Sequence, residues 1–381
     1  MTRRAVPDEH AGLVRDVVAL TERRATDWFS GFEGRRPVVS LVSYSVRPRC
    51  YLYRFTLTSP SARREIVAKV RHSDPQHRRA DRYPDRPELT PHRTISDAEA
   101  AHLEYVGLNQ IAVALQGADP RRLGVLRALA ELPERATVVM EYVDQPTLRQ
   151  LVARPRARPG RRARGPLRDC VWTALGEWLS RFHSAHPGDS RPGRMTSSDD
   201  VADQLDRSVE FVARTGVDVS GIRCLREFAI RRLYAGWQSE LPSALGHGDF
   251  TAQNVFVAPE GRITIFDPLP RWRVCVFEDL ARLTMGLRLL GPQAATRGRL
   301  FSPAHLDRWE SDLLAAYSGS ARPLQDLLHV YQAVLLLDRW CQLLGKRPQG
   351  GRGRDNFRRA RVRITTGWFD SEAVRLSGLL G

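Results

Sequence analysis

His247-Gly-Asp-Phe-Thr-Ala-Gln-Asn254, followed thirteen residues later by Asp267, places four polar side chains at fixed intervals in one short part of the chain. Asp249 supplies a potential base, while Asn254 and Asp267 supply oxygen atoms of the kind that Mg²⁺ prefers. Chance rarely brings these four residue types together at these intervals. We therefore interpret the pattern as a site for phosphoryl transfer.

The residues between Asn254 and Asp267 explain the spacing. Residues 255–258 and 262–266 have strand composition, and Pro-Glu-Gly at 259–261 has turn composition. A tight hairpin would bring Asn254 and Asp267 to two ends that face the same cleft. The sequence therefore predicts that both side chains share one metal ion.

The segment from His247 to Asp267 resembles the catalytic loop and metal-binding Asp of the aminoglycoside phosphotransferase and choline kinase family. The resemblance implies an α+β, protein-kinase-like fold with a small antiparallel β N-lobe and a larger, mainly helical C-lobe. It also implies a kinase that moves the γ-phosphate of ATP or GTP to a hydroxyl. His-Gly-Asp in place of the His-Arg-Asp of protein kinases favours a small-molecule acceptor, such as an aminoglycoside, a sugar or another natural product.

The resemblance assigns roles to these residues. Asp249 becomes the catalytic residue, which accepts or orients the proton of the acceptor hydroxyl, and Asn254 and Asp267 become the Mg²⁺ ligands. His247 braces the loop. Asp279 lies in Glu278-Asp-Leu-Ala-Arg282, which resembles a family element that supports the catalytic loop through structure.

A nucleotide-binding lysine is expected in an upstream strand, and composition narrows the search. The chain has 59 Lys and Arg residues, but only Lys69 and Lys346 are lysines. Lys69 ends Ile-Val-Ala-Lys, which has the Val-Ala-x-Lys character of the third N-lobe strand of kinases. An ammonium group suits phosphates as a compact point charge, so Lys69 is the predicted nucleotide-binding residue.

A carboxylate on the next helix should orient this lysine. Glu99, in a credible helix from 96 to 106, is the preferred candidate because it matches the family's usual position. Ser96-x-x-Glu99 is also a capping box, in which Glu99 would bond to the backbone instead. Glu104 is the third candidate.

The lobe boundaries follow from strand and helix patterns. We expect an N-terminal helical extension over 1–30, with its helix at 10–29, a nucleotide-binding N-lobe over 31–143 and a catalytic C-lobe over 144–381. In the N-lobe the predicted strands are 38–44, 51–57, 65–70, 123–132 and 137–143. By position, the Glu141 carbonyl and the Val143 amide are expected to bind the nucleotide base, which leaves ATP and GTP equally open.

Two segments of the N-lobe depart from the family pattern. The place of the glycine-rich phosphate loop is taken by 44–50, which contains no glycine, so a different backbone or Arg47 and Arg49 must cover the phosphates. A polar stretch at 71–95 is too long for a turn and is interpreted as an insertion.

In the C-lobe, periodic apolar residues predict helices at 167–186, 306–317 and 324–344. Its acceptor-binding residues are not specified by the sequence. Four aspartates between 199 and 206 would suit a cationic acceptor, although an acidic first helical turn is the simpler interpretation. An Arg-rich loop at 154–164 would suit an anionic or lipid-linked glycan, or is only a solvated loop.

The overall composition limits the class of protein. The formal net charge of +16 is compatible with nucleic-acid binding, but the Arg-rich stretch lacks interleaved aromatics and no nucleic-acid motif is present. No apolar run reaches eighteen residues and the first ten residues lack a signal-peptide core, so we expect a cytoplasmic protein without a transmembrane segment. The remaining alternative is a catalytically silent, nucleotide-binding module of the same fold.

Overall fold

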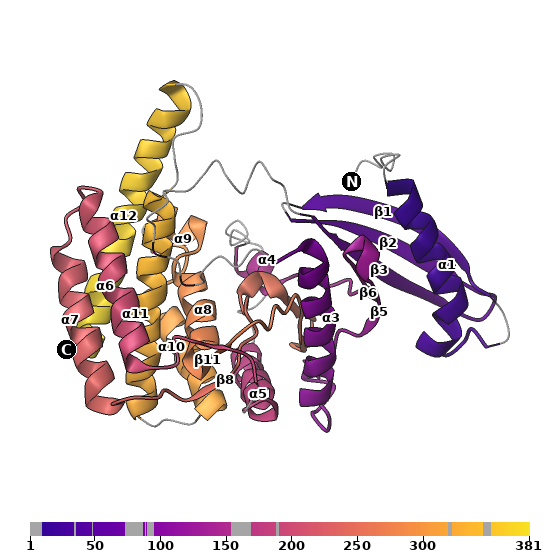
Figure 1. The fold of residues 1–381 in the computed structure, drawn as a ribbon, viewed down its shortest axis with the longest axis horizontal. Helices are drawn as coiled ribbons and strands as arrows, with labels where there is room; N and C mark the ends of the chain where they lie inside the picture. Colours follow the sequence, from indigo (N-terminus) through magenta and orange to yellow (C-terminus); the bar gives the residue numbers. More distant parts are fainter. Residues whose placement is uncertain are drawn as a thin grey trace, which may run out of the picture.

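The computed structural model describes residues 10–33, 36–47, 49–72, 87, 89, 95–153, 169–187, 190–296, 298–318, 322–345 and 352–381. It has two lobes, with the β-rich lobe on the right of Figure 1 and the helical lobe on the left. The α+β, protein-kinase-like architecture predicted from the sequence is confirmed.

The N-lobe is built on a five-stranded antiparallel sheet in the order β1-β2-β3-β6-β5. Its strands are β1 (Val38–Arg47), β2 (Cys50–Thr58), β3 (Arg63–Arg71), β5 (Ala128–Leu132) and β6 (Thr137–Glu141). They are rich in β-branched and aromatic residues, which favour a pleated, half-buried surface. Because Arg47 pairs with Cys50, a very short turn joins β1 to β2.

One face of this sheet is covered by α1 (Ala11–Trp28), which confirms the helix predicted at 10–29 (Figure 1). Leu13, Val17, Ala25 and Trp28 are buried at helical spacing. They belong to one apolar cluster with alternate residues of the sheet, among them Phe55 and Ile66 on β2 and β3. The opposite face of β3, which carries Lys69, is therefore turned away from α1.

Helix α3 (Asp97–Ala114) packs against β3, β5 and β6 on that second face and against α5 (Cys170–Ala185) of the C-lobe. A side chain at Gly107 would collide with Pro268, because an added Cβ would lie 2.8 Å from its ring. The missing side chain lets α3 approach the segment that follows Asp267. The helix thus links the two lobes.

The predicted hairpin is confirmed as β9 (Val255–Val257) and β10 (Ile263–Ile265). It follows the short helix η3 (Ala252–Asn254). Strand β10 also pairs in parallel with β4 (Leu123–Gly124). The single strand predicted at 123–132 is therefore wrong, since its first part belongs to a sheet of the C-lobe and only β5 belongs to the N-lobe.

A second small sheet has the order β7-β11-β8, and its strand β8 directly precedes the His-Gly-Asp motif. The remaining elements of the C-lobe are mainly helices: α4 (Leu148–Val152), β7 (Gly193–Arg194), α6 (Ser198–Arg214), α7 (Ser220–Gly236), β8 (Ser243–Leu245), β11 (Arg273–Cys275), α8 (Val276–Arg288), α9 (Gly291–Ala295), α10 (Pro303–Ser318), α11 (Arg322–Leu344) and α12 (Arg352–Leu380). Helices α5, α10 and α11 confirm the three helices predicted in this lobe.

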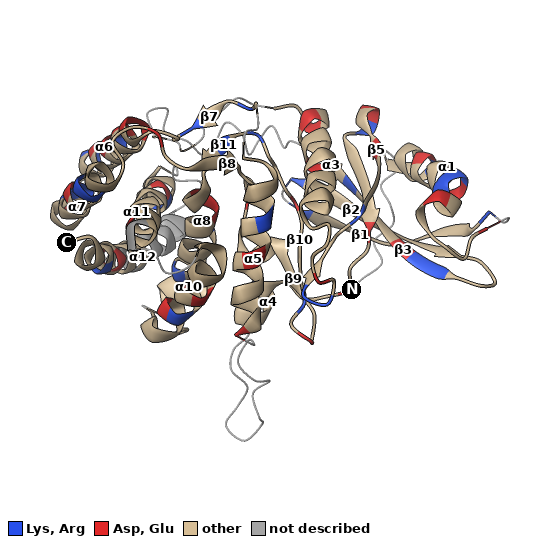
Figure 2. Cartoon of the chain, turned by 90° about the horizontal axis from the view of Figure 1, so that it is seen from below, with Lys and Arg blue, Asp and Glu red and all other residues tan. Residues whose placement is uncertain are grey.

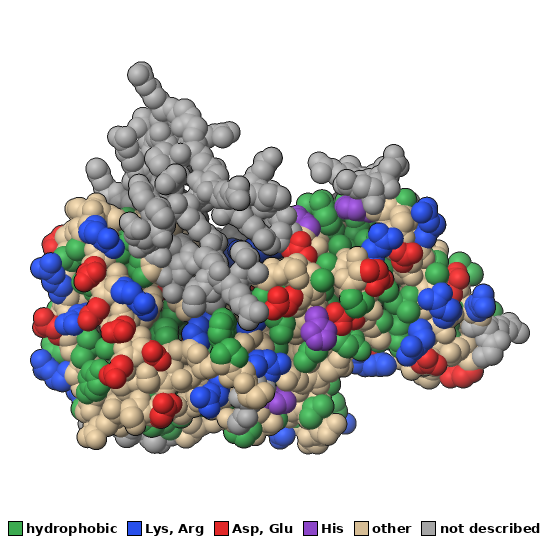
Figure 3. Space-filling view, viewed as in Figure 1, with side chains coloured by type: hydrophobic (Ala, Val, Ile, Leu, Met, Phe, Trp, Pro, Cys, Tyr) green, Lys and Arg blue, Asp and Glu red, His purple; other side chains and the backbone are tan. Residues whose placement is uncertain are grey.

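Charged residues of both signs are distributed over the helices and strands in Figure 2. On the face shown in Figure 3, basic and acidic side chains are interspersed in the same way. No helix in the described part of the chain combines the length and the apolar content that crossing a membrane requires.

If α1 is an integral part of the N-lobe core, truncating its buried face should destabilise the protein. We expect Leu13→Ala to lower the free energy of unfolding by about 2–5 kcal/mol, because Leu13 is buried against the sheet cluster. Arg23→Ala, on the exposed side of the same helix, should change it by less than about 0.5 kcal/mol. Urea unfolding of both variants measures the difference, and equal stabilities would show that α1 is only appended.

Candidate active site

The His-Gly-Asp loop is held tightly against the segment that follows Asp267. The His247 carbonyl accepts a hydrogen bond of 2.8 Å from the Leu269 amide. Gly248 has φ +86°, and a Cβ there would lie 2.2 Å from the Leu269 carbonyl oxygen. Only glycine combines this backbone conformation with this contact. The middle residue of the motif thus fixes the distance between the loop and the Asp267 segment.

Asp249 and Asn254 form the contact at the centre of the loop. The Asn254 side-chain amide donates to the Asp249 backbone carbonyl and to Asp249 Oδ2, each at 2.9 Å. Gln253 also approaches Oδ2, at 3.5 Å. Both amides contact the same oxygen, so Asp249 Oδ1 remains available to a substrate hydroxyl. The side-chain oxygen of Asn254 is likewise free of this contact.

A network of buried hydrogen bonds holds the His-Gly-Asp loop in place. Asp279 Oδ2 accepts a hydrogen bond of 2.7 Å from the His247 amide, and His183 Nε2 lies 3.4 Å from the same oxygen. Burial opposes ionisation of Asp279, but His183 and His247 hold its pKa below the ordinary value. His247 itself packs edge-on against Trp178 and Phe250, and its burial lowers its pKa.

Asp279 thus contacts the backbone of His247, and support of the site stays the predicted role of both residues. Burial favours the neutral imidazole of His247, which is suited to packing against the aromatic rings. The acid beneath the loop orients its backbone. His183, near the end of α5, belongs to the same network and also contacts the Tyr317 hydroxyl at 2.9 Å.

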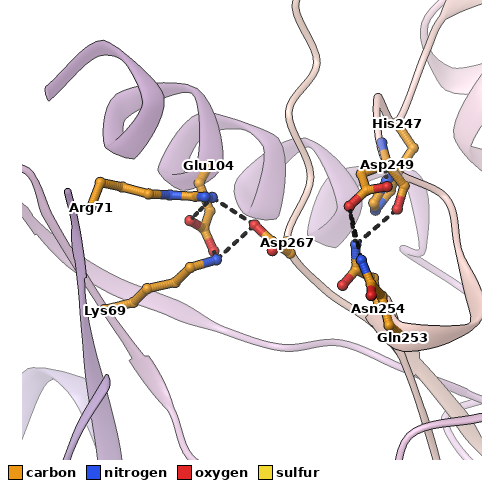
Figure 4. A network of polar contacts seen from close by, with 8 residues as sticks. All are labelled: Lys69, Arg71, Glu104, His247, Asp249, Gln253, Asn254 and Asp267. Atoms are coloured by element: carbon orange, nitrogen blue, oxygen red, sulfur yellow. Dashed lines mark hydrogen bonds and ion pairs between the residues drawn. The ribbon is translucent and has the colours of Figure 1, made fainter. Parts of the chain in front are cut away.

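On the N-lobe side, Lys69 lies between two carboxylates (Figure 4). Its Nζ donates to Glu104 Oε1 at 2.8 Å and to Asp267 Oδ1 at 2.6 Å. The Lys69 side chain is 8% exposed and that of Glu104 is 1% exposed. Burial opposes the charge on Lys69, but the two carboxylates raise its pKa above the ordinary value.

The prediction that Glu99 orients Lys69 is wrong. Glu99 is exposed at the first turn of α3, where its backbone amide donates to the Ser96 hydroxyl at 3.0 Å. Glu104 lies instead on the buried stripe of α3, with Ala101, Leu108 and Ile111. A glutamate at helical phase with three apolar residues is a signal of a buried, paired charge, and it was available in the sequence.

Arg71 belongs to the site, although the sequence interpretation placed it in the polar insertion at 71–95. It is the last residue of β3, and its Nη2 contacts Glu104 Oε2 at 2.5 Å and Asp267 Oδ1 at 2.6 Å. Residues two apart on a strand share a face, so Arg71 follows Lys69 toward the cleft. Most of the insertion beyond His72, and the Arg-rich loop at 154–164, lie outside the described residues.

Asp267 is the residue on which these contacts converge. Its backbone is left-handed, with φ +59°, and Figure 4 shows its carboxylate directed toward Lys69 and Arg71 and away from Asn254. Burial would raise the pKa of Asp267, but the two cations lower it well below the ordinary range. The carboxylate is therefore charged throughout the physiological pH range.

The donor atoms present suit Mg²⁺. Within the described residues no group of three or more His, Cys, Asp or Glu side chains is arranged to hold a metal ion. Asp267 and Asn254 offer one carboxylate and one amide oxygen, which fits a cation that proteins bind through few ligands together with substrate phosphates. This donor set leaves the remaining coordination positions to phosphate and water.

The predicted base-binding residues lie at the junction of the lobes. Glu141 ends β6, and its side chain pairs with Arg127 at 2.9 Å. Val143 follows two residues later and packs on the C-lobe core. Their role in binding the nucleotide base stays a prediction.

The acidic stretch at 199–206 has a structural explanation. Ser197 caps α6, and Asp199 and Asp200 lie in its first turn, where the helix dipole favours acids. Asp199 also accepts a hydrogen bond of 2.6 Å from the Tyr234 hydroxyl, and Asp206 pairs with Arg226. The stretch therefore gives little support to a cationic acceptor.

Comparison with known proteins supports the resemblance seen in the sequence. Residues 97–268 match the model of a family described as the phosphotransferase enzyme family. This segment contains Glu104, Asp249, Asn254 and Asp267. No match was found among curated proteins.

Solved structures share the fold at low identity. A choline/ethanolamine kinase family protein from Mesorhizobium loti is 15% identical, with 96% of this chain and 99% of that chain covered and a TM-score of 0.50. A choline kinase from Cryptosporidium parvum is 11% identical, with coverage of 96% and 99% and a TM-score of 0.50. A type I macrolide 2'-phosphotransferase is 13% identical, with coverage of 95% and 99% and a TM-score of 0.50.

The family match and the shared fold confirm two predictions made from the sequence. The chain resembles aminoglycoside phosphotransferases and choline kinases, and it is an enzyme of the phosphotransferase class with a hydroxyl acceptor. Its individual site residues are not tested by these comparisons.

The contact at Gly248 should make this position intolerant of any side chain. We expect Gly248→Ala to lower the free energy of unfolding because the methyl group overlaps the Leu269 carbonyl. The loss should be about 1–3 kcal/mol greater than for a glycine at which alanine strains only the backbone. Gly216→Ala is the matched control, since Gly216 also has positive φ, +75°, but open space around it. Urea unfolding compares the two, and equal losses would contradict the close approach.

The assignment of Glu104 can be tested against Glu99. We expect Glu104→Gln to lower the free energy of unfolding by about 3–5 kcal/mol, because it leaves Lys69 and Arg71 buried with one carboxylate fewer. Glu99→Gln should change it by less than about 0.5 kcal/mol, because Glu99 is exposed. Chemical unfolding of both variants decides, and a larger loss for Glu99→Gln would restore the original prediction.

Proposed function

We propose that this protein transfers the γ-phosphoryl group of ATP or GTP, bound with Mg²⁺, to a hydroxyl group of a small molecule. One observation carries the proposal. Asp249 and Asn254 on the catalytic loop stand opposite Asp267 and the Lys69–Glu104 pair across the same region (Figure 4). A base, two metal ligands and a phosphate-binding cation are the parts that this reaction requires.

Asp249 would accept the proton of the acceptor hydroxyl. Its Oδ2 is engaged by Asn254 and Gln253, which fixes the carboxylate and directs Oδ1 to the substrate. The Asp279 carboxylate beneath the loop holds the His247 backbone and thereby the position of Asp249. Positioning of this kind contributes much of the catalysis when the protein itself forms no bond to the phosphoryl group.

Asn254 and Asp267 would hold the metal ion, and Lys69 would bind the phosphates with Glu104 behind it. Mg²⁺ supplies charge neutralisation at the phosphate oxygens as the transferred group moves. Lys69 contributes a permanent cation to the same region, because its pKa is raised by the two carboxylates. Glu141 and Val143 would bind the nucleotide base through their backbone groups.

The acceptor is proposed only as a small molecule that carries a hydroxyl group. The pairing of Asp199 and Asp206 with neighbours on α7 removes the clue that favoured a cationic acceptor. The rival function is a silent nucleotide-binding module. Such a module would lack one of the catalytic groups, whereas Lys69, Asp249, Asn254 and Asp267 are all present.

The proposal predicts a separation between turnover and binding at Asp249. We expect Asp249→Asn to reduce Mg²⁺-dependent turnover of ATP by about 10²–10⁴-fold, because the general base is lost. Nucleotide affinity should stay within about threefold, since Asp249 is assigned no contact with the nucleotide. Turnover is measured with labelled ATP, first as background hydrolysis and then with acceptors found in a metabolite screen.

Asp27→Asn is a suitable control, because this aspartate is exposed on α1 and should leave turnover unchanged. Retained turnover in Asp249→Asn would contradict the assigned base. A wild-type protein that binds nucleotide but turns over none in any screen would favour the silent module.

A further inference from the structure

Arg71 is a cation in the site for which the proposed reaction, with Lys69 as its phosphate-binding residue, leaves no role. Its side chain is 10% exposed, and one nitrogen, Nη2, bridges Glu104 and Asp267. Together with Lys69 it forms a closed ring of two cations and two carboxylates (Figure 4). The charges in this ring sum to zero.

We propose that Arg71 is a second phosphate-binding residue, which exchanges its contact with Asp267 for the nucleotide phosphates when the metal–nucleotide complex binds. The inference rests on the proposed function and deepens it. It makes Asp267 a shared position, bound by Arg71 in one state and by the metal ion in the other.

The first argument is competition for one carboxylate. Asp267 Oδ1 accepts from both Lys69 Nζ and Arg71 Nη2 at 2.6 Å, and the carboxylate is directed away from Asn254. A metal ion shared by Asn254 and Asp267 would have to draw this carboxylate toward Asn254. At least one of the two cations must then give up its contact with Asp267.

The second argument is the unused capacity of the guanidinium group. Arginine has five N–H donors, and the contacts of Arg71 to Glu104 and Asp267 both use Nη2. Its Nε is buried and has no hydrogen-bond partner among the described residues. A buried donor without a partner is unfavourable, and phosphate oxygens are the acceptors that the planar guanidinium group matches best.

The third argument is the architecture around Arg71. The segment that joins β1 to β2 is short and contains no glycine. It therefore lacks the glycine-rich loop whose backbone amides would cover the phosphates. Cys50, the first residue after this turn, pairs directly with Arg71 across β2 and β3. The His72 amide also donates to the Arg49 carbonyl at 3.2 Å. Arg71 therefore lies beside the turn and can add phosphate-binding donors at a place without a glycine-rich loop.

Charge balance distinguishes Mg²⁺ alone from Mg²⁺ with nucleotide. A free divalent cation would bind next to two cations in a ring without net charge, so electrostatic attraction would contribute little to its affinity. A metal–nucleotide complex is anionic, so it would compensate Lys69 and Arg71 as they leave Asp267. The site should thus bind the metal ion weakly by itself and more tightly with nucleotide.

The test uses the full-length protein and the variants Arg71→Gln and Arg71→Lys. Calorimetry measures the affinity for ADP in the presence of saturating Mg²⁺, and electron paramagnetic resonance measures the binding of Mn²⁺ without nucleotide. Arg63→Gln is the matched control, because Arg63 is on the same strand but its side chain is 71% exposed. It removes the same charge away from the ring.

We expect Arg71→Gln to weaken ADP binding by about 10-fold or more, since charge-assisted hydrogen bonds to phosphate are lost. The same variant should bind Mn²⁺ more tightly than the wild type, because Asp267 loses one of its two cationic partners. Arg71→Lys keeps a charge beside Glu104 but loses the forked donors. It should fold, and its affinities for ADP and Mn²⁺ should lie between those of the wild type and of Arg71→Gln. A purely structural role would lower stability without tightening Mn²⁺ binding.

Unchanged ADP affinity in the folded variants would overturn the role of Arg71 and leave the proposed function intact. A wild-type protein that binds no nucleotide would overturn both. Thermal unfolding identifies the variants that fold. If Arg71→Gln does not fold, the ADP and Mn²⁺ affinities of Arg71→Lys test the proposal in its place.

Discussion

The ion pair between Lys69 and Asp267 is the contact on which the rest of the site depends, because it joins the two lobes through single atoms 2.6 Å apart. Glu104 and Arg71 complete the pairing from α3 and the end of β3. Buried charges are stable only when they are paired, and each member of the ring pairs with two charges of the opposite sign. Ion pairs as well as apolar packing therefore connect β3, α3 and the segment that carries Asp267.

The catalytic loop follows a different principle. It is fixed by backbone contacts, since the Leu269 amide donates to the His247 carbonyl and the His247 amide donates to Asp279. An aromatic layer formed by Trp178, Phe182 and Phe250 closes the space beneath it. The loop therefore fixes Asp249 through its Oδ2, and among the described residues no hydrogen bond to its Oδ1 is found.

Short-range patterns in the sequence predicted much of this arrangement. The hairpin between Asn254 and Asp267 and the strand that ends near Lys69 could be read from composition and alternation, because each depends on neighbouring residues. The choice between Glu99 and Glu104 depends on which face of α3 meets the sheet, and only the apolar stripe of the helix records it. The pairing of β4 with β10 joins residues far apart in sequence, and no local pattern indicates it.

Gly107 has a mechanical consequence. With no side chain at this position, α3 rests directly against Pro268, one residue beyond Asp267. The helix that carries Glu104 and the segment that carries Asp267 are thus in close contact. Activation by an outward swing of this helix would have to open a close-packed proline contact. It would also have to break the ion pairs through which Glu104 is joined to Asp267 by Lys69 and Arg71.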